Sequence, residues 1–274
     1  MNIPIKKLMI QVLLLRILIT YGQGHSIEYI MTYKPSLENN KKNSQLYFLD
    51  ILNNESLFRS EKSRDSDSIQ NKTGYSGSGS TIFNDYFYIK KNMNNNSVYK
   101  LISVPLSTDK FNIKMTKPLN WKLSSDTKVI EKFRCQKAEV EYGGRHWTAW
   151  FTEEIGIPEG PYIFNNLPGL IIQISDQNKE YVFQLIKIKK YYHKELYTTK
   201  MGKEITQNEY EKIQIDYYND PFAFVKSQNL KTVTDDGMGG TKKLDFREMT
   251  QAIRERIREN NNPIEINHNI EYKP

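Results

Sequence analysis

The sequence is almost free of cysteine, because Cys135 is the only one among its 274 residues. No disulfide can therefore form within the chain, even in an oxidising compartment. A chain of this length buries most of the surface that it exposes when unfolded, so a hydrophobic core is sufficient to stabilise it. The length is also compatible with a single β-rich domain.

The sequence also lacks an apolar run long enough for a membrane-spanning helix, which needs about 20 residues. Its N-terminal candidate, residues 8–21, contains Gln11 and Arg16, follows two lysines and precedes small residues. This pattern is typical of a secretory signal peptide. We therefore expect residues 1–24 to be removed and residues 25–274 to be exported as one domain; an uncleaved anchor is the alternative.

A strong excess of one charge is missing as well. The formal charge of +7 falls to +4 once the three basic residues of the N-terminal segment are left out. Proteins that bind nucleic acids concentrate their basic residues in patches. Such a mild excess indicates an ordinary solvated surface and gives no reason to expect a nucleic-acid partner.

Strand-like patterning dominates what the sequence does contain. From residue 27 to residue 190, short runs rich in Tyr, Phe, Ile, Val and Trp alternate with Asn, Gly, Ser and Asp, which is typical of β-strands joined by turns. Hairpins are predicted to turn at Asn53 and Asn54 and within residues 92–96. Residues 60–80 are polar and rich in Gly and Ser, so we expect a flexible insertion there.

The strongest local prediction is a hairpin that turns at residues 143–144, a Gly–Gly pair between two aromatic-rich arms. Pairing outward from this turn places Glu141 opposite His146 and Lys137 opposite Trp150. Because side chains alternate between the faces of a strand, one face collects the apolar residues of both arms. These are Ala138, Val140, Tyr142, Trp147, Ala149 and Phe151. A slip of one residue would invert the faces, so the pattern fixes the register.

A second hairpin and two helices complete the expected elements. Residues 170–190 carry alternating apolar side chains and turn near residues 176–179. A short helix is predicted after Thr206, which has capping-box spacing to Glu209. A longer helix is predicted after Asp245, with one apolar stripe at helical spacing. The stripe consists of Phe246, Met249, Ile253 and Ile257.

The segment 160–176, GPYIFNNLPGLIIQISD, combines turn residues with large apolar side chains. Because proline restricts φ and removes a hydrogen-bond donor, we expect a rigid, buried crossover between the two hairpins. Tyr162 and Phe164 are predicted to alternate in a short edge segment, and Gly169 is predicted to take positive φ in a type II turn. The alternative is that this segment forms the mouth of a ligand pocket.

The same segment resembles the signature of the GLPGLI family, a group of exported bacterial proteins. The run that gives the family its name occupies residues 166–171, with Asn166 in place of the usual Gly. Asn tolerates a left-handed backbone, so this departure is compatible with the resemblance. The resemblance also includes residues 135–138, 144–145, 149–151, 157–158, 160–162 and 262–265. It implies a periplasmic or cell-envelope location in a Gram-negative bacterium and no particular activity.

Side chains with catalytic potential are few and isolated. His146 faces Glu141, a pair that can orient a general base or bind a metal, but no nucleophile lies at a motif spacing and a surface ion pair is the simpler interpretation. Cys135 lacks a neighbour that would lower the pKa of its thiol, so we expect it to be unreactive. Trp150 lies on the polar face, where Lys137, another strand, the C-terminal helix or a ligand would cover it. We assign no catalytic residue, no metal and no cofactor.

The elements together predict a mainly β fold, a strongly curved antiparallel sheet or half-barrel with a C-terminal helix and little other helix. By analogy of fold alone, a large curved sheet crossed by a helix encloses a concave apolar cavity. The distinction between a cavity and a filled core depends on the surroundings of four side chains. They are Trp147, Phe151, Phe183 and Leu185.

We therefore expect a non-enzymatic envelope protein that binds an apolar ligand, a lipid or a peptide. The candidate binding residues are Trp147, Trp150, Tyr162, Phe164 and His146. The second hypothesis is an interaction module for an outer-membrane protein or a transporter. The third is a hydrolase that uses His146 and Glu141. No membrane span is expected after removal of the signal peptide.

Overall fold

The structure is a computed structural model that describes residues 24–75, 83, 87–230, 232–235, 237 and 240–273. The predicted signal peptide therefore lies outside the described residues, except for Gly24, which begins the first strand. Within the described ranges, no helix is both long enough and apolar enough to cross a membrane.

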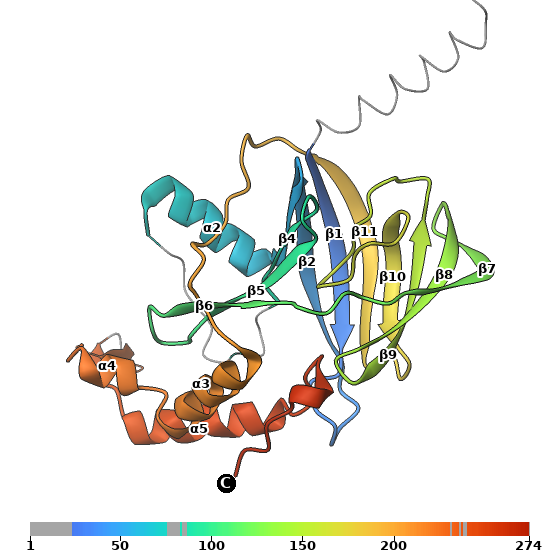
Figure 1. Ribbon diagram of the computed structural model, residues 1–274. Coiled ribbons are helices and arrows are strands. Elements are labelled where there is room, and N and C mark those ends of the chain that lie inside the picture. Colours follow the sequence, from blue (N-terminus) through green and yellow to red (C-terminus); the bar gives the residue numbers. More distant parts are fainter. Residues whose placement is uncertain are drawn as a thin grey trace, which may run out of the picture.

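One sheet of twelve strands forms most of the fold (Figure 1), in the order β12-β6-β5-β4-β3-β2-β1-β11-β10-β9-β8-β7. The strands are β1 (Gly24–Tyr33), β2 (Asn43–Leu52), β3 (Glu55–Ser60), β4 (Ile89–Asn92), β5 (Ser97–Ser103), β6 (Lys110–Lys114), β7 (Lys122–Ile130), β8 (Phe133–Tyr142), β9 (Arg145–Thr152), β10 (Leu170–Asp176), β11 (Tyr181–Tyr191) and β12 (Lys203–Glu204). Neighbours are antiparallel, except that β12 and β6 pair in parallel. β13 (Val233–Asp235) and β14 (Thr241–Lys243) form a separate hairpin. The prediction of a mainly β fold built on an open sheet is confirmed.

The sheet is strongly curved, and the length of one connection requires it. β6 and β7 occupy the second and twelfth positions of the sheet, ten strand spacings apart. A flat sheet would separate them by about 48 Å, at about 4.8 Å for each spacing. The chain covers this gap from Lys114 to Lys122, and eight residues reach at most about 29 Å. The sheet therefore folds back on itself, and Figure 1 shows the segment after β6 passing across β1, β11 and β10 to reach β7.

The hairpins predicted from the sequence are present. β8 and β9 pair in the predicted register, with Glu141 opposite His146 and Lys137 opposite Trp150. Gly143 and Gly144 join the two strands with positive φ angles of 64° and 79°, as a two-residue hairpin turn requires. The hairpins β2–β3, β4–β5 and β10–β11 are confirmed as well.

A continuous hydrophobic core fills the inside of the curved sheet. Trp147, Phe151 and Phe183 are fully buried in it, and Leu185 is 6% exposed. The four side chains that distinguish a cavity from a filled core therefore lie in a filled core. A ligand would have to bind away from these four side chains.

The crossover between β9 and β10 is buried against the same core, as predicted. Tyr162 and Phe164 are 3% and 0% exposed, but they lie in turn and irregular backbone, so the predicted edge segment is wrong. The left-handed residues of the crossover are Tyr162 and Asn166, with φ of 53° and 66°, and not Gly169. Gly169 is required for a different reason, because a Cβ atom there would lie 2.0 Å from the carbonyl oxygen of Thr152.

The predicted flexible insertion is wrong over its first part, where α2 (Glu61–Thr73) forms beside β2 and β3. The hydroxyl of Ser60 caps the start of this helix, and Gly74 ends it with φ of 79°. Asp67 of α2 is buried and accepts a hydrogen bond of 2.7 Å from Arg59. Polar contacts hold this helix in place, and its sequence has no apolar stripe. The periodic pattern that predicts a helix is therefore missing. The insertion from residue 76 to residue 80 lies outside the described residues.

Three helices from the C-terminal part pack against β5 and β6. They are α3 (Gln207–Asn219), α4 (Ala223–Ser227) and α5 (Phe246–Glu259). The predicted capping box of Thr206 and Glu209 begins α3, and Asp245 caps α5 as predicted. A second, smaller core holds these helices to the sheet. It includes Ile102, Ile113, Tyr217, Phe222, Ile253 and Ile257.

Candidate functional site

A cleft lies between the segment that follows β6 and the β8–β9 hairpin. Residues 113–120 form one wall, and residues 139–143 with His146 form the other. The chain that follows α5 contributes Glu265 and His268. The cleft has a volume of about 680 Å³, which is within the range of ligand-binding sites in proteins.

A smaller, aromatic pocket of about 120 Å³ adjoins this cleft, between the sheet and α3. Its aromatic walls are Tyr33, Phe83, Phe87, Tyr162, Tyr181 and Tyr210. Phe87 and Tyr162 meet edge to face, with ring centroids 5.4 Å apart. An apolar cavity of about 150 Å³ holds benzene, so this aromatic pocket is close in size to a site for one ring or one branched aliphatic group.

Glu265 stands at the boundary between the cleft and the aromatic pocket, and lines both. Its carboxylate accepts hydrogen bonds from Lys100, Tyr142 and Tyr162. Burial by itself would raise the pKa of Glu265, but the charge of Lys100 and these hydrogen bonds hold that pKa below its ordinary value of 4.5. Burial and the charge of Glu265 raise the pKa of both tyrosines well above 10.0, so they stay neutral donors.

Arg145 holds the chain after α5 in the position that places Glu265 at this boundary. Its buried guanidinium donates hydrogen bonds of 3.0 Å to the carbonyl oxygen of Ile264 and 2.5 Å to Asn262, and it pairs with Asp176 at 2.8 Å. The turn beside it is equally tight, because a Cβ atom on Gly144 would lie 2.8 Å from the side chain of the residue after Glu265. A hairpin turn of two glycines and one buried arginine therefore form the platform on which the C-terminal chain rests.

His146 lies on the wall of the cleft and makes the predicted pair with Glu141. Its Nδ1 is 2.7 Å from a carboxylate oxygen of Glu141, and its Nε2 is 3.7 Å from Glu139. The hydrogen bond that Lys137 donates to Glu139 is the largest cause of the lowered pKa of Glu139, and the charges of Lys137 and His146 lower this pKa further. Among the described residues of the cleft wall, no hydroxyl is hydrogen-bonded to His146.

The structure separates the five predicted binding residues. Tyr162 lines the aromatic pocket and His146 lines the cleft. Trp147 and Phe164 pack against each other in the filled core, with their rings tilted by 54° and their centroids 4.8 Å apart. Trp150 lies in neither cavity.

Among the alternatives for the cover of Trp150, the structure shows a residue of another strand. The ammonium of Lys128 lies 4.1 Å from the centroid of its ring, as in a cation–π pair. Lys128 belongs to β7, which pairs with β8 on the outside of the hairpin. The ammonium of Lys137 pairs with Glu139 at 2.7 Å. The helix α5 belongs to the second core, whereas Trp150 packs against the first.

The sequence analysis missed Lys100 and Glu265 as a pair at the site. The two residues are 165 positions apart in the chain, and no motif or periodicity connects such distant positions. The available signal was the resemblance at residues 262–265, which includes the glutamate but says nothing about its partner. Lys100 carries no signal of its own, because it occupies an ordinary alternating position of β5.

Two other candidate sites carry little chemistry. Cys135 is fully buried, and burial raises the pKa of its thiol, which makes it a poor nucleophile. In the part of the chain that the structure describes, no group of three or more His, Cys, Asp or Glu side chains is placed to hold a metal ion.

Comparison with known proteins gives a similar fold. No protein-family model matches the sequence, and no curated protein matches it. Two solved structures of PNGF-II, in space groups C2 and P21, align with TM-scores of 0.52 and 0.50, each at 18% sequence identity. The alignment covers 70% of this chain and 33% of each PNGF-II chain, so the chain spans about a third of the length of these proteins. At this identity the similarity shows a shared fold alone.

Proposed function

We propose that this protein is a non-enzymatic binding protein of the cell envelope, and that its ligand places one apolar group in the aromatic pocket and a polar part in the cleft. The single observation that carries the proposal is that the two cavities share four wall residues. These are Lys100, Gln207, Glu265 and His268. One molecule can therefore occupy both cavities across this shared wall.

The chemistry of the walls favours a peptide among the possible ligands. The aromatic pocket suits a Phe, Leu or similar side chain, because its volume of about 120 Å³ is too small for a whole lipid chain. The cleft beside it offers lysines, glutamates and His146, which suit the amide and charged groups of a polypeptide. Glu265 provides a buried carboxylate where the aromatic pocket meets the cleft, and its hydrogen bonds hold this carboxylate in place.

Export to the periplasm or cell envelope is part of the same proposal. It rests on the N-terminal pattern of residues 1–24 and on the resemblance to the GLPGLI family. Fractionation of cells that express the full chain, with the N-terminus of the product sequenced, tests it. We expect a product in the envelope fraction that begins near residue 25; an intact chain in the cytoplasmic fraction would contradict the proposal.

Binding is tested with two small probes that differ in one side chain. N-acetylphenylalaninamide carries a ring and two amides, and N-acetylglycinamide carries the amides alone. From the usual gain per atom for small ligands, we expect the first to bind with a dissociation constant of about 1 mM. Ligand-observed saturation-transfer NMR measures this directly, and we expect no transfer to the glycine compound.

A blocking variant shows where the probe binds. Gln207 is half-buried in the wall shared by both cavities, whereas the next residue, Asn208, is exposed on the same helix turn. The indole of Gln207→Trp should occupy the space where the aromatic pocket meets the cleft, and so abolish the saturation transfer. Asn208→Trp should leave the saturation transfer unchanged. Equal transfer to the two variants, or none to the unmodified protein, would refute the proposed site.

A further inference from the structure

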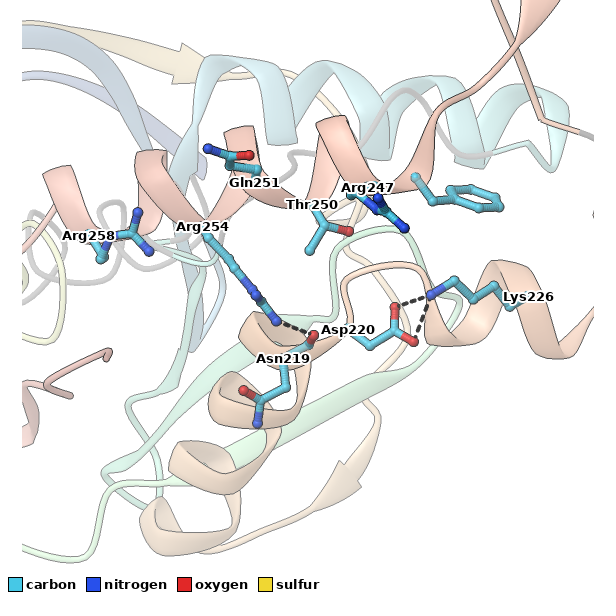
Figure 2. A pocket seen from close by; sticks show the side chains of 9 residues that line it. Asn219, Asp220, Lys226, Arg247, Thr250, Gln251, Arg254 and Arg258 are labelled. Carbon is cyan, nitrogen blue, oxygen red and sulfur yellow. Dashed lines mark hydrogen bonds and ion pairs between the residues drawn. The ribbon is translucent and has the colours of Figure 1, made fainter. Parts of the chain in front are cut away.

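A third cavity lies among the C-terminal helices, where the proposed function makes no use of it. It is a groove of about 660 Å³ between α5 and the connection from α3 to α4. Figure 2 shows Thr250 and Arg254 projecting from α5 toward this connection, where Asp220 faces Lys226. The groove adjoins the second core, because its wall residue Phe246 packs against that core.

One wall of the groove is a stripe of arginines on a single face of α5. Arg247, Arg254 and Arg258 line it, with Thr250 and Gln251 between them. Spacings of seven and four residues place these side chains on the same side of a helix. At about 1.5 Å per residue, the stripe extends over about 16 Å from the first arginine to the last.

The cationic side chains that line the groove outnumber the carboxylates that line it. Four cationic side chains line it, against one carboxylate, that of Asp220. Lys226 pairs with this carboxylate at 2.7 Å. Arg254 donates to the carbonyl oxygens of residues 218 and 219 at the end of α3, at 2.8 and 2.6 Å.

The other two arginines keep their charge. Arg258 donates a hydrogen bond of 2.6 Å to the hydroxyl of Tyr218. Arg247 is exposed, and its guanidinium makes no hydrogen bond or ion pair with any residue that the structure describes. Two guanidinium groups at opposite ends of the groove are therefore not neutralised by a carboxylate.

We propose that this groove binds an extended polyanion whose charged groups are phosphates. Guanidinium groups bind phosphate oxygens through paired hydrogen bonds, and the hydroxyl and amide between them add uncharged donors. The length of the stripe suits a chain of several phosphates, because a single phosphate is smaller than the distance between its ends. A flat anionic membrane fits less well, since Arg254 and Arg258 are half-buried in a concave groove.

The probe for this proposal is inorganic tripolyphosphate, titrated into the exported chain by isothermal calorimetry at low salt. We expect measurable binding that weakens as salt is raised, and affinity about tenfold lower for orthophosphate, which reaches only one arginine. Arg247→Gln removes a side chain with no structural contact and should weaken tripolyphosphate about fivefold. The double variant with Arg258→Gln should weaken it further.

Arg256→Gln is the matched control, because it removes the same charge from a residue of α5 that does not line the groove. We expect this control to bind tripolyphosphate within about twofold of the unmodified protein. Equal weakening by Arg247→Gln and Arg256→Gln, or no binding of tripolyphosphate, would overturn the proposal. A further result would also overturn it: the unmodified protein binds phosphatidylglycerol vesicles but not tripolyphosphate, and Arg247→Gln loses the binding to vesicles. That result would indicate a membrane-binding surface.

Discussion

Lys91 and Glu159 form an ion pair inside the curved sheet, and its removal gives the sharpest test of the fold. The Lys91 ammonium lies 2.6 Å from the carboxylate, and the two side chains are 1% and 0% exposed. The ammonium also donates to the carbonyl oxygen of Gly160 at 2.9 Å, and Ser56 donates to the carboxylate at 3.0 Å. This pair therefore fastens β4 to the start of the buried crossover.

Lys91→Met should destabilise the protein by about 3–5 kcal/mol, because it leaves a buried carboxylate whose only remaining side-chain donor is one hydroxyl. The double variant Lys91→Met with Glu159→Met removes both charges and should recover most of this loss. Lys90→Met is the matched control, since Lys90 pairs with Glu55 at the surface, where such a pair contributes less than about 1 kcal/mol.

Urea unfolding followed by tryptophan fluorescence measures these free energies, and a constant m-value shows that the variants unfold in the same way. A cost for Lys91→Met no larger than for Lys90→Met would refute the argument from burial. So would a double variant as unstable as the sum of the single changes, because then the partner left behind would not be the cause of the loss.

Three further predictions concern the crossover and the site. Gly169→Ala should cost about 1–3 kcal/mol in urea unfolding, because its Cβ would lie 2.0 Å from the carbonyl oxygen of Thr152. Asn166→Ala should cost about 1 kcal/mol because φ is 66° there, whereas Asn166→Gly should cost nothing. The lowered pKa of Glu265 means that its contribution to stability is present above pH 4.5 and is lost as the pH falls through its folded-state pKa. The difference in unfolding free energy between the unmodified protein and Lys100→Met should therefore shrink from pH 7 to about pH 3.

The sequence predicts the β part of the fold well because its signals are local. The alternation of apolar side chains around residues 143–144 fixes the register of β8 and β9, and the structure has the same pairs. Capping residues are equally local, so Thr206 and Asp245 mark the starts of α3 and α5. A curved sheet is part of the same prediction, and the strand order shows why the curvature is required, because a short connection joins β6 to β7.

The errors have a common physical cause, which is that polar contacts between distant residues leave no periodic signal. α2 has no apolar stripe and is held by Asp67 against Arg59. Lys100 and Glu265 meet from distant parts of the chain. The predicted binding residues Trp147 and Phe164 are chosen for their aromatic side chains, and the structure buries both of them in the core.

Native mass spectrometry of residues 25–274, before and after extraction with organic solvent, tests the proposed binding function most directly. The account predicts bound mass in the protein as purified, its loss on extraction, and its absence from the Gln207→Trp variant but not from Asn208→Trp. A clean mass of the unliganded chain, or bound mass that is the same in both variants, would contradict the claim that the aromatic pocket and the cleft together form the ligand site.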